Sequence, residues 1–258
     1  MKEPRYGNWI SSKLVAASLA AAFALLIGAR LAVGHSRLLV GVLLAATLIA
    51  MAAAMYLLPC RTALSYEGGG VQGRVLDGVL DALDGAGWDG RGRLLDIGCG
   101  SGALTIACAK RNPQGKMVGI DRWGKEYASF TLPLCEKNAA AEGVKNALFR
   151  RGNAVKLDFP DESFDAVTSN YVYHNITGKD KQQLLLETLR VLKKGGTFAI
   201  HDLMSPGRYG DMQAFVQKLR DMGYERVELI DTTDGSFMTP KEAKRLMLRG
   251  STLLVGRK

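Results

Sequence analysis

Two long apolar runs open the chain, and shorter apolar periods follow them. Residues 14–27 are almost wholly apolar, and residues 38–58 form 21 positions without a charge. A helix needs about 20 apolar residues to cross a bilayer. The pattern therefore predicts a transmembrane helical hairpin within residues 1–60, with helices at about 10–33 and 38–58 and an end to the second helix at Pro59.

After a glycine-containing linker at residues 61–70, the pattern becomes that of a globular domain. Apolar residues recur with helical spacing over residues 71–83, which predicts an amphipathic helix. Strands and helices then alternate, at residues 94–97, 103–109, 116–120, 123–141, 147–150, 164–169, 179–192, 197–200, 227–230 and 252–255. This alternation predicts an α/β domain over residues 71–258, with a doubly wound, mostly parallel sheet that binds its ligand at the carboxyl ends of the strands.

The sharpest break in the pattern lies at residues 94–102, Leu-Leu-Asp-Ile-Gly-Cys-Gly-Ser-Gly. A buried strand ends there in three glycines spaced G-x-G-x-G, and a helical segment follows. Glycines permit positive φ and a close approach of the backbone to a ligand, and amides at a helix start favour a polar or anionic group. The loop therefore predicts a nucleotide-like cofactor. Gly98, Gly100 and Ala103 alone also fit the dinucleotide pattern G-x-G-x-x-G/A.

The whole phrase, with Asp96 two positions before the first glycine, resembles the first motif of class I S-adenosylmethionine (SAM) methyltransferases. The resemblance implies a seven-stranded Rossmann-like fold, SAM as the cofactor, and a role for Asp96 and the loop amides in holding its methionine end. Residues 187–197 also resemble the family's helix, glycine turn and fifth strand, with Lys194 where proline is usual. The resemblance covers residues 71–258.

Polar residues at further strand ends follow the family's order of cofactor contacts. Asp121 closes the second strand 25 residues beyond Asp96, where the resemblance implies hydrogen bonds to both ribose hydroxyls. Asn153 and Ala154 stand where the family reads the adenine edge, and Asn170 stands beside the expected methyl group. Any one of these residues alone is more often structural. The predicted cofactor-binding set is Asp96, Gly98, Cys99, Gly100, Gly102, Asp121, Arg122, Asn153, Ala154 and Asn170.

Histidines and tyrosines after the fourth and fifth strands are the candidates for catalysis. His174 and His201 face the same predicted crevice, and a histidine there is suited to act as a base near neutral pH. A packing or capping role is an equally good interpretation of His174 and a slightly better one of His201. Tyr171 and Tyr173 add apolar area and hydroxyl groups, which suits a pocket for a flat or amphipathic acceptor.

Charge and cysteine content argue against several partners. The net charge is +9, but Lys and Arg are scattered and do not interleave with aromatic residues. Asn170 is followed by Tyr171 and Val172, not by the Pro-Pro-aromatic sequence typical of methyltransferases that act on DNA bases, so we expect no nucleic acid substrate. Anionic lipid headgroups explain the positive charge more simply. The four cysteines show no metal-ligand spacing, so we expect no metal.

These features predict a membrane-anchored methyltransferase that acts on a small, hydrophobic or lipid-like acceptor. Two alternatives stay open: a NAD-binding oxidoreductase, and a non-catalytic SAM-binding membrane protein. The oxidoreductase is disfavoured because no Tyr-x-x-x-Lys pair accompanies the glycine loop. The sequence does not identify the acceptor atom.

The apolar hairpin also predicts where the protein lies. We expect an integral membrane protein with a cytoplasmic catalytic domain, since a hairpin returns the chain to the side where SAM is made. A secretory signal peptide, with the small pair Gly28-Ala29 at its end, is the competing interpretation of the first run. Small residues four apart would allow close helix approach and association into a homo-oligomer; they are Ala20, Ala24 and Gly28 in the first run and Ala46, Ala50 and Ala54 in the second.

Overall fold

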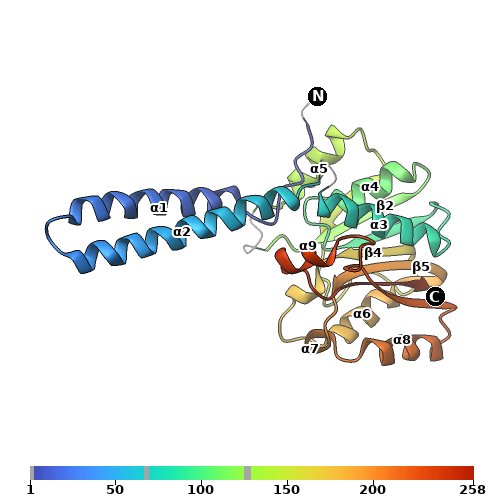
Figure 1. Cartoon of the computed structure of the whole chain (residues 1–258). Helices are drawn as coiled ribbons and strands as arrows, with labels where there is room; N and C mark the ends of the chain where they lie inside the picture. The colour runs from blue at the N-terminus through green and yellow to red at the C-terminus, as the bar shows by residue number, and fades with distance from the viewer. Residues whose placement is uncertain (1–2, 67–69, 125–128) are drawn as a thin grey trace. The chain divides into compact units, whose positions relative to one another are not determined.

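The computed structural model describes residues 3–66, 70–124 and 129–258 and divides the chain into two compact units. One unit is Asn8–Gly73, and the other joins the described part of the first seven residues to Arg74–Lys258 (Figure 1). The chain therefore leaves the larger unit after Gly7 and returns to it at Arg74. The expected linker at residues 61–70 falls partly outside the described residues.

The smaller unit is a hairpin of two helices, α1 (Ser12–Ala32) and α2 (Arg37–Ala63). Both are long and apolar enough to cross a membrane, judged by length and composition. The expected end of the second helix at Pro59 is wrong, since α2 continues to Ala63. Proline removes one backbone donor, but the turn after it still closes, and the amide of Leu64 donates to the carbonyl of Cys60.

Contact between α1 and α2 follows a seven-residue repeat. The buried positions include Val15, Ala22 and Ala29 on α1 and Thr47 and Ala54 on α2. Ala54 belongs to the expected row of small residues, but Ala20 and Ala24 are exposed. On α1, the small residues expected to approach the other helix are therefore not the residues that pack within the hairpin. The packed residues are spaced seven apart and lie on a different face of the helix.

Polar contacts close the open end of the hairpin. The side-chain amide of Asn8 donates to the carbonyls of Arg61 and Leu64, at 2.8 and 2.7 Å. The Arg61 guanidinium in turn donates to the carbonyl of Ile10. The segment before α1 and the last turns of α2 are thus held together.

The larger unit is built on a seven-stranded sheet with the order β3-β2-β1-β4-β5-β7-β6 (Figure 1). The strands are β1 (Arg93–Ile97), β2 (Lys116–Asp121), β3 (Ala147–Arg151), β4 (Phe164–Asn170), β5 (Leu192–Leu203), β6 (Arg226–Asp231) and β7 (Ser251–Arg257). Neighbouring strands from β3 to β5 are parallel, whereas β7 is antiparallel to both β5 and β6. The predicted mostly parallel, doubly wound sheet is confirmed.

Helices cover both faces of this sheet and bury their apolar sides against it. They are α3 (Val71–Gly85), α4 (Ala103–Arg111), α5 (Leu132–Ala141), α6 (Lys181–Arg190), α7 (Pro206–Tyr209), α8 (Met212–Asp221), α9 (Pro240–Arg245) and the short 3-10 turn η2 (Tyr173–Asn175). In α8, for example, Phe215, Val216 and Leu219 are buried, as the spacing of an amphipathic helix requires.

The helix expected at residues 123–141 is shorter in the structure. α5 begins at Leu132, where the hydroxyl of Thr131 accepts from the amide of Leu134 and Pro133 occupies the first turn. Trp123 has a positive φ of 46°, which is incompatible with a helix, and residues 125–128 lie outside the described residues. The strong start signal at Thr131 and Pro133 outweighs the apolar spacing before it.

Candidate active site

The glycine loop between β1 and α4 is tightly constrained by its neighbours. Gly98, Gly100 and Gly102 all have positive φ, at 73°, 57° and 86°. A Cβ at Gly98 would lie 2.2 Å from a methyl group of Val172, so the segment after β4 rests directly on the loop. The expected strand, glycine turn and helix are therefore present, and the loop is adjacent to the segment that carries His174.

Asp96, next to the carboxyl end of β1, is almost completely buried, with 1% of its surface exposed. The hydroxyl of Thr105 donates to Asp96 Oδ2 at 2.5 Å, and that of Thr168 donates to Oδ1 at 3.4 Å. Burial raises the pKa of Asp96 from 3.8 to about 6, and the charge of Asp121 adds to the increase. The carboxyl group thus links β1 to α4 and β4, and its contact with the methionine end of SAM stays a prediction.

The raised pKa of Asp96 gives a pH test of that contact. If Asp96 pairs with the cofactor's ammonium group, SAM affinity should reach its full value well above pH 6, where Asp96 is ionised, and should fall as the pH drops through about 6 and the carboxyl group is protonated. Calorimetric titrations between pH 5 and 8 measure the effect, and Asp96→Asn should remove the inflection. A wild-type affinity that shows no inflection in this range would assign Asp96 a purely structural role.

Ionisation of Asp96 also opposes folding, because its pKa is higher in the folded protein than in the unfolded chain. The free energy of unfolding should therefore decrease as the pH rises from 4 to 6.

Asp121 lies at the carboxyl end of β2 and holds the glycine loop through backbone amides. Its Oδ2 accepts from the amide of Gly100 at 3.0 Å, and its Oδ1 accepts from the amide of Trp123 at 2.7 Å. The Trp123 indole N–H donates to the carbonyl of Gly100 at 2.9 Å. Asp121 and Gly100, both in the predicted cofactor-binding set, are therefore in direct contact, whereas Arg122 is exposed.

The segment after β3 lies next to Asp121. The amide of Gly152 donates to the backbone carbonyl of Asp121 at 3.0 Å. Asn153 is exposed, and its side-chain carbonyl accepts from the amide of Val155 at 3.0 Å, which closes a local turn. Asn153 and Ala154 are thus brought to the same edge as Asp121, and their contact with adenine stays a prediction.

His201, on β5, is a buried structural residue. Its Nδ1 pairs with Asn170 Oδ1 and its Nε2 with the hydroxyl of Thr232, both at 2.9 Å, and the side chain is fully buried. Burial lowers the pKa of His201 to about 4, so the ring is neutral at physiological pH. This geometry agrees with the packing interpretation of His201, and it places Asn170 against His201.

His174 is held by Asp202, a residue that the sequence does not single out. His174 Nδ1 lies 2.5 Å from Asp202 Oδ1, and its side chain keeps 18% of its surface exposed. Burial alone would raise the pKa of Asp202, but the hydrogen bond and charge of His174, with the Leu203 amide, hold it below its ordinary value. Because Nδ1 faces a carboxylate, the neutral ring carries its lone pair on Nε2.

The backbone fixes the same carboxylate from its other side. Asp202 Oδ2 accepts from the amides of Tyr173 and His174, at 2.7 and 3.2 Å, and Oδ1 accepts from the amide of Leu203 at 2.6 Å. Asp202 is fully buried. Asp202 thus resembles the acid that orients the histidine in catalytic triads. In such groups a buried carboxylate fixes the tautomer and the direction of the imidazole ring.

Tyr171 and Tyr173 are both buried, with 8% and 0% of their surfaces exposed, so neither offers the open aromatic surface expected of a pocket wall. Tyr171 has a positive φ of 56°, and its hydroxyl lies 2.6 Å from that of Ser251. Tyr173 is fully buried, and its hydroxyl lies 2.6 Å from that of Thr188. Burial raises the pKa of both phenols above the ordinary range. Tyr173 is therefore a core residue and does not line the crevice as expected, because the left-handed Tyr171 and the following 3-10 turn redirect it.

Phe237 is a second residue that sequence reasoning misses. Its ring lies 5.5 Å from that of His201, and the Tyr171 ring lies 4.6 Å from the same imidazole. Phe237 precedes α9 and stands 36 positions from His201 in the sequence, so only the fold joins them. The position of Asp202, directly after His201 at a strand end, was a local sequence signal for a functional role. Nothing in the sequence around Phe237 gives such a signal.

Cys99 packs in the loop rather than presenting a reactive group. It is buried in an apolar cluster with Ile106, Cys135 and Phe149. Burial raises the pKa of its thiol well above the ordinary value, so the thiol is neutral. Within the described ranges, no group of three or more His, Cys, Asp or Glu side chains is placed to hold a metal ion.

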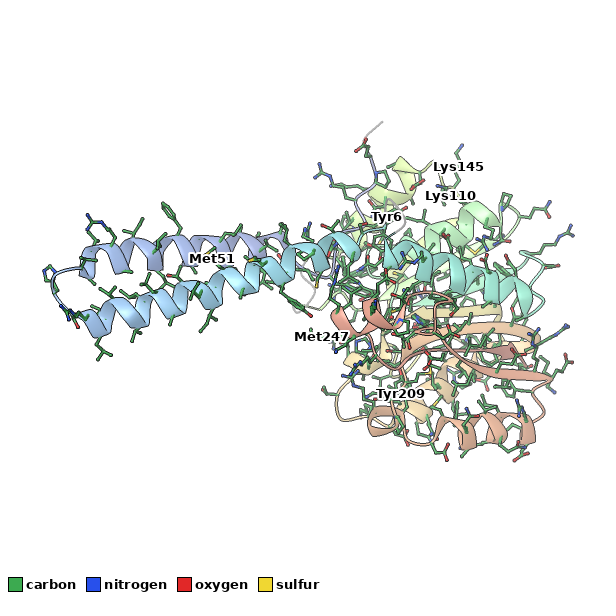
Figure 2. All side chains as sticks on the ribbon, in the orientation of Figure 1. Tyr6, Met51, Lys110, Lys145, Tyr209 and Met247 are labelled. Carbon is green, nitrogen blue, oxygen red and sulfur yellow. The ribbon has the colours of Figure 1, made fainter. Side chains whose placement is uncertain are left out.

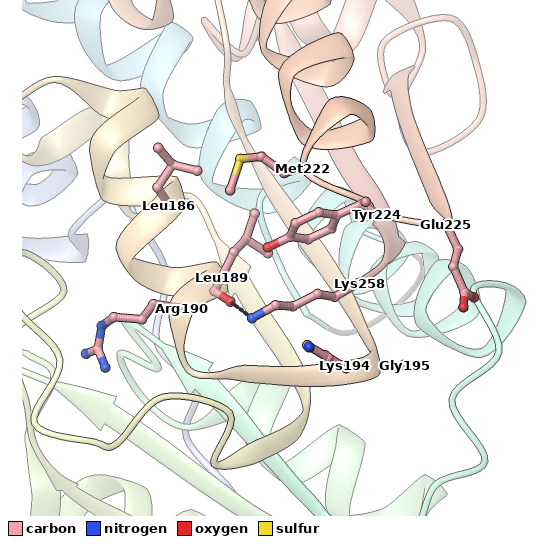
Figure 3. Close-up of a pocket in the computed structure, with 10 residues that line it drawn as sticks. Leu186, Leu189, Arg190, Lys194, Gly195, Met222, Tyr224, Glu225 and Lys258 are labelled. Atoms are coloured by element: carbon pink, nitrogen blue, oxygen red, sulfur yellow. Dashed lines mark hydrogen bonds between the residues drawn. The ribbon is translucent and has the colours of Figure 1, made fainter.

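A separate cavity of about 670 Å³ lies at the start of β5 (Figure 3). Lys194, Gly195 and Tyr224 line it, and Lys258 crosses it to donate to the carbonyls of Leu189 and Leu192, at 3.1 and 2.7 Å. Ligands of such sheets bind at the carboxyl ends of the strands, and this cavity lies at the opposite end of β5 from Asp202. It is therefore distinct from the candidate active site.

The sheet order and the glycine loop define the class I methyltransferase architecture. A dinucleotide-binding sheet of the common type has the order 3-2-1-4-5-6 with all strands parallel, whereas here the antiparallel β7 lies between β5 and β6. Residues 89–240 match the model of a methyltransferase domain family. The chain belongs to that family, and this assignment replaces the oxidoreductase alternative.

Individual relatives cover parts of the chain. A demethylmenaquinone methyltransferase of Roseiflexus castenholzii is 36% identical over 115 residues, which is 45% of this chain and 44% of the relative. The chain thus spans about half the length of the curated relatives it matches. The [4+2]-cyclase SpnF shares the fold with a TM-score of 0.55 at 21% identity, over 72% of this chain and 80% of its own.

A phosphoethanolamine N-methyltransferase of Haemonchus contortus, solved with S-adenosyl-L-methionine, has a TM-score of 0.51 at 21% identity. The match covers 67% of this chain and 43% of the other. At such identity, these two solved structures support the fold alone. A cyclase and a methyltransferase share it, so the reaction must be argued from the site.

Proposed function

We propose that this protein transfers a methyl group from SAM to a small hydrophobic acceptor, with His174 as the general base. The observation that carries the proposal is the His174–Asp202 pair on the segment that rests, through Val172, against Gly98 of the glycine loop. When bound, SAM supplies an electrophilic methyl group. His174 Nε2 takes the proton that the acceptor loses, and Asp202 stabilises the resulting imidazolium.

The residues at the carboxyl edge of the sheet fit the cofactor. Each oxygen of Asp121 accepts one backbone amide, and a carboxylate has about four acceptor positions, so two ribose hydroxyls can be added without losing either amide. Among the described residues, a Cβ at Gly100 would meet the ring of Phe130 alone, at 3.6 Å, which is an ordinary van der Waals contact. This capacity supports SAM as the cofactor.

An aromatic side chain beside the base supports a hydrophobic, quinone-type acceptor. The ring of Tyr171 lies 6.2 Å from that of His174, the proposed base, and such an aromatic neighbour suits a flat acceptor. The curated relatives include demethylmenaquinone methyltransferases from several bacteria. An acceptor with an ionisable hydroxyl or carbon acid would give the base a proton to remove.

The exposed surface of the hairpin supports a membrane anchor. Large apolar side chains such as Phe23, Leu31, Ile49 and Met55 are each at least 67% exposed within the described structure. A core helix of a soluble protein would bury such residues, whereas lipid chains would cover them. We therefore propose an integral membrane protein whose catalytic domain lies on the cytoplasmic side.

The test of the proposed function is methyl transfer from labelled SAM into an extract that contains lipids and metabolites. We expect label in the organic phase with the wild-type protein and little with His174→Gln. Label confined to the aqueous phase would contradict the hydrophobic acceptor. SAM binding without transfer in any fraction would instead favour a non-catalytic SAM-binding protein.

The topology of the hairpin is a separate prediction. We expect residue 35, in the turn between the helices, to lie outside and both termini to lie in the cytoplasm. His35→Cys is a suitable reporter, because Ser36 caps α2 and its replacement would cost about 1 kcal/mol. All four native cysteines are buried, which keeps background labelling low.

A membrane-impermeant maleimide should label His35→Cys in intact cells and should label the exposed control Ser236→Cys only after lysis. Labelling of Ser236→Cys in intact cells would place the catalytic domain outside and would favour the signal-peptide interpretation of the first apolar run.

A further inference from the structure

Residues 5–7, here termed the N-terminal strap, pack on the catalytic domain even though the hairpin separates them in the chain. The amide of Arg5 donates to Asn138 Oδ1 at 2.8 Å, and Asn138 Nδ2 donates back to the carbonyl of Arg5 at 3.1 Å. Tyr6, labelled in Figure 2, lies beside the catalytic domain, and its hydroxyl donates to Glu142 Oε1 at 3.1 Å. The strap thus lies along α5, held by both backbone and side chain.

Asn138 connects the strap to the glycine loop. Asn138 is buried, with 2% of its surface exposed, and the second proton of Nδ2 goes to the carbonyl of Ser101 at 2.9 Å. Both amide protons and the oxygen of Asn138 are therefore used, two contacts facing the strap and one facing the loop. Release of Arg5 would remove two of the three hydrogen bonds that orient this amide.

Aromatic contacts make a second connection between the strap and the loop. A Cβ at Gly7 would lie 2.9 Å from the ring of Phe130, and a Cβ at Gly100 would lie 3.6 Å from the same ring. Tyr6 and Trp123 pack on the apolar cluster that contains Cys99 of the loop. Displacement of the strap would thus expose Phe130 and the apolar cluster that contains Cys99, both of which lie against the glycine loop.

We propose that the N-terminal strap is a positioning element of the cofactor site, which holds the glycine loop in its binding conformation through Asn138 and Phe130. The proposal rests on the proposed binding of SAM to this loop. Coupling between two sites is reciprocal, so cofactor binding must stabilise the docked strap to the same extent that the strap strengthens cofactor binding.

The position of the strap in the chain gives it a further consequence. The strap precedes α1, and the domain that it touches follows α2, so the segments on either side of the hairpin belong to one folded unit. If the helices span a membrane, the strap and the catalytic domain must lie on the same side of it. Removal of the first apolar run as a signal peptide would also remove the strap.

The test uses full-length protein in detergent and S-adenosylhomocysteine as the ligand. Arg5 is exposed, and tryptic cleavage after it requires the strap to leave α5. Saturating ligand should slow this cleavage at least about fivefold, while cleavage after the exposed Arg249 stays unchanged. Mass spectrometry of the released peptides measures both rates.

Two variants of Tyr6 provide the matched comparison, since Tyr6 belongs to the strap and is not one of the predicted cofactor-binding residues. Tyr6→Ala should raise the Kd for S-adenosylhomocysteine at least about fivefold, and Tyr6→Phe, which keeps the packed ring, should raise it less. Equal affinities in all three proteins, with an unprotected Arg5 site, would overturn the strap's role while leaving the proposed function intact. A wild-type protein that binds no S-adenosylhomocysteine would overturn both.

Discussion

Replacement of His174 by glutamine is expected to lower kcat by about a hundredfold or more and to leave SAM affinity nearly unchanged. A general base contributes about 10²- to 10⁴-fold to rate, and glutamine cannot accept the proton although it is similar in size. His174 is held by Asp202 at 2.5 Å and keeps part of its surface exposed, as a base that meets an acceptor requires. Steady-state kinetics and calorimetry on the same preparation separate the two effects.

The pH profile sharpens this prediction. If the acceptor can ionise by itself, activity of His174→Gln should partly recover at high pH, because the base is no longer needed. A variant that retains near-normal kcat at every pH would leave alignment of donor and acceptor as the whole mechanism.

His201→Gln is the matched control, since both histidines lie at the carboxyl edge of the sheet. His201 is fully buried and has a partner at each ring nitrogen, Asn170 and Thr232. Its replacement should lower the free energy of unfolding by about 1–3 kcal/mol, with little direct effect on kcat in the fraction that stays folded. A large loss of kcat in folded His201→Gln would move the catalytic role to this residue.

The strands were predictable because each is a short apolar run with a sharp end. Leu94, Leu95 and Ile97 are fully buried in the middle of the sheet, and such strands read as near-continuous hydrophobic segments. Helix ends were less predictable. The segment at 123–141 has helical spacing, but the cap at Thr131 with Pro133 sets the start of α5, and local start signals of this kind compete with periodicity.

The predicted cofactor-binding residues could be found from the sequence where they lie close together in the chain. Asp96 and the glycines belong to one phrase, and Asp121 follows at the end of the next strand. The His174–Asp202 pair joins residues 28 positions apart on neighbouring strand ends, so its partner depends on sheet order. Tyr171 and Tyr173 also look equivalent in sequence, but Tyr171 has a positive φ and pairs with Ser251 on β7, whereas Tyr173 pairs with Thr188 on α6.

Replacement of Asp121 by alanine should weaken SAM binding by about 1.5–3 kcal/mol, or roughly 10- to 150-fold in Kd. The variant would lose charge-assisted hydrogen bonds to the ribose hydroxyls and also the two amide contacts that order the loop, to Gly100 and Trp123. Asp121→Asn should lose less, because one acceptor oxygen remains for an amide or a hydroxyl. Calorimetry with SAM and S-adenosylhomocysteine measures the series.

Asp231→Ala is the matched control for Asp121→Ala. Asp231 also ends a strand, β6, and accepts from the amide of Thr233 at 2.8 Å, so its removal disturbs a similar local turn. β6 is an edge strand at the opposite side of the sheet from β2, far in strand order from the glycine loop. Asp231→Ala should therefore leave SAM affinity unchanged. If both variants bind SAM as tightly as the wild type, Asp121 makes no ribose contact, and the cofactor must lie elsewhere along the carboxyl edge.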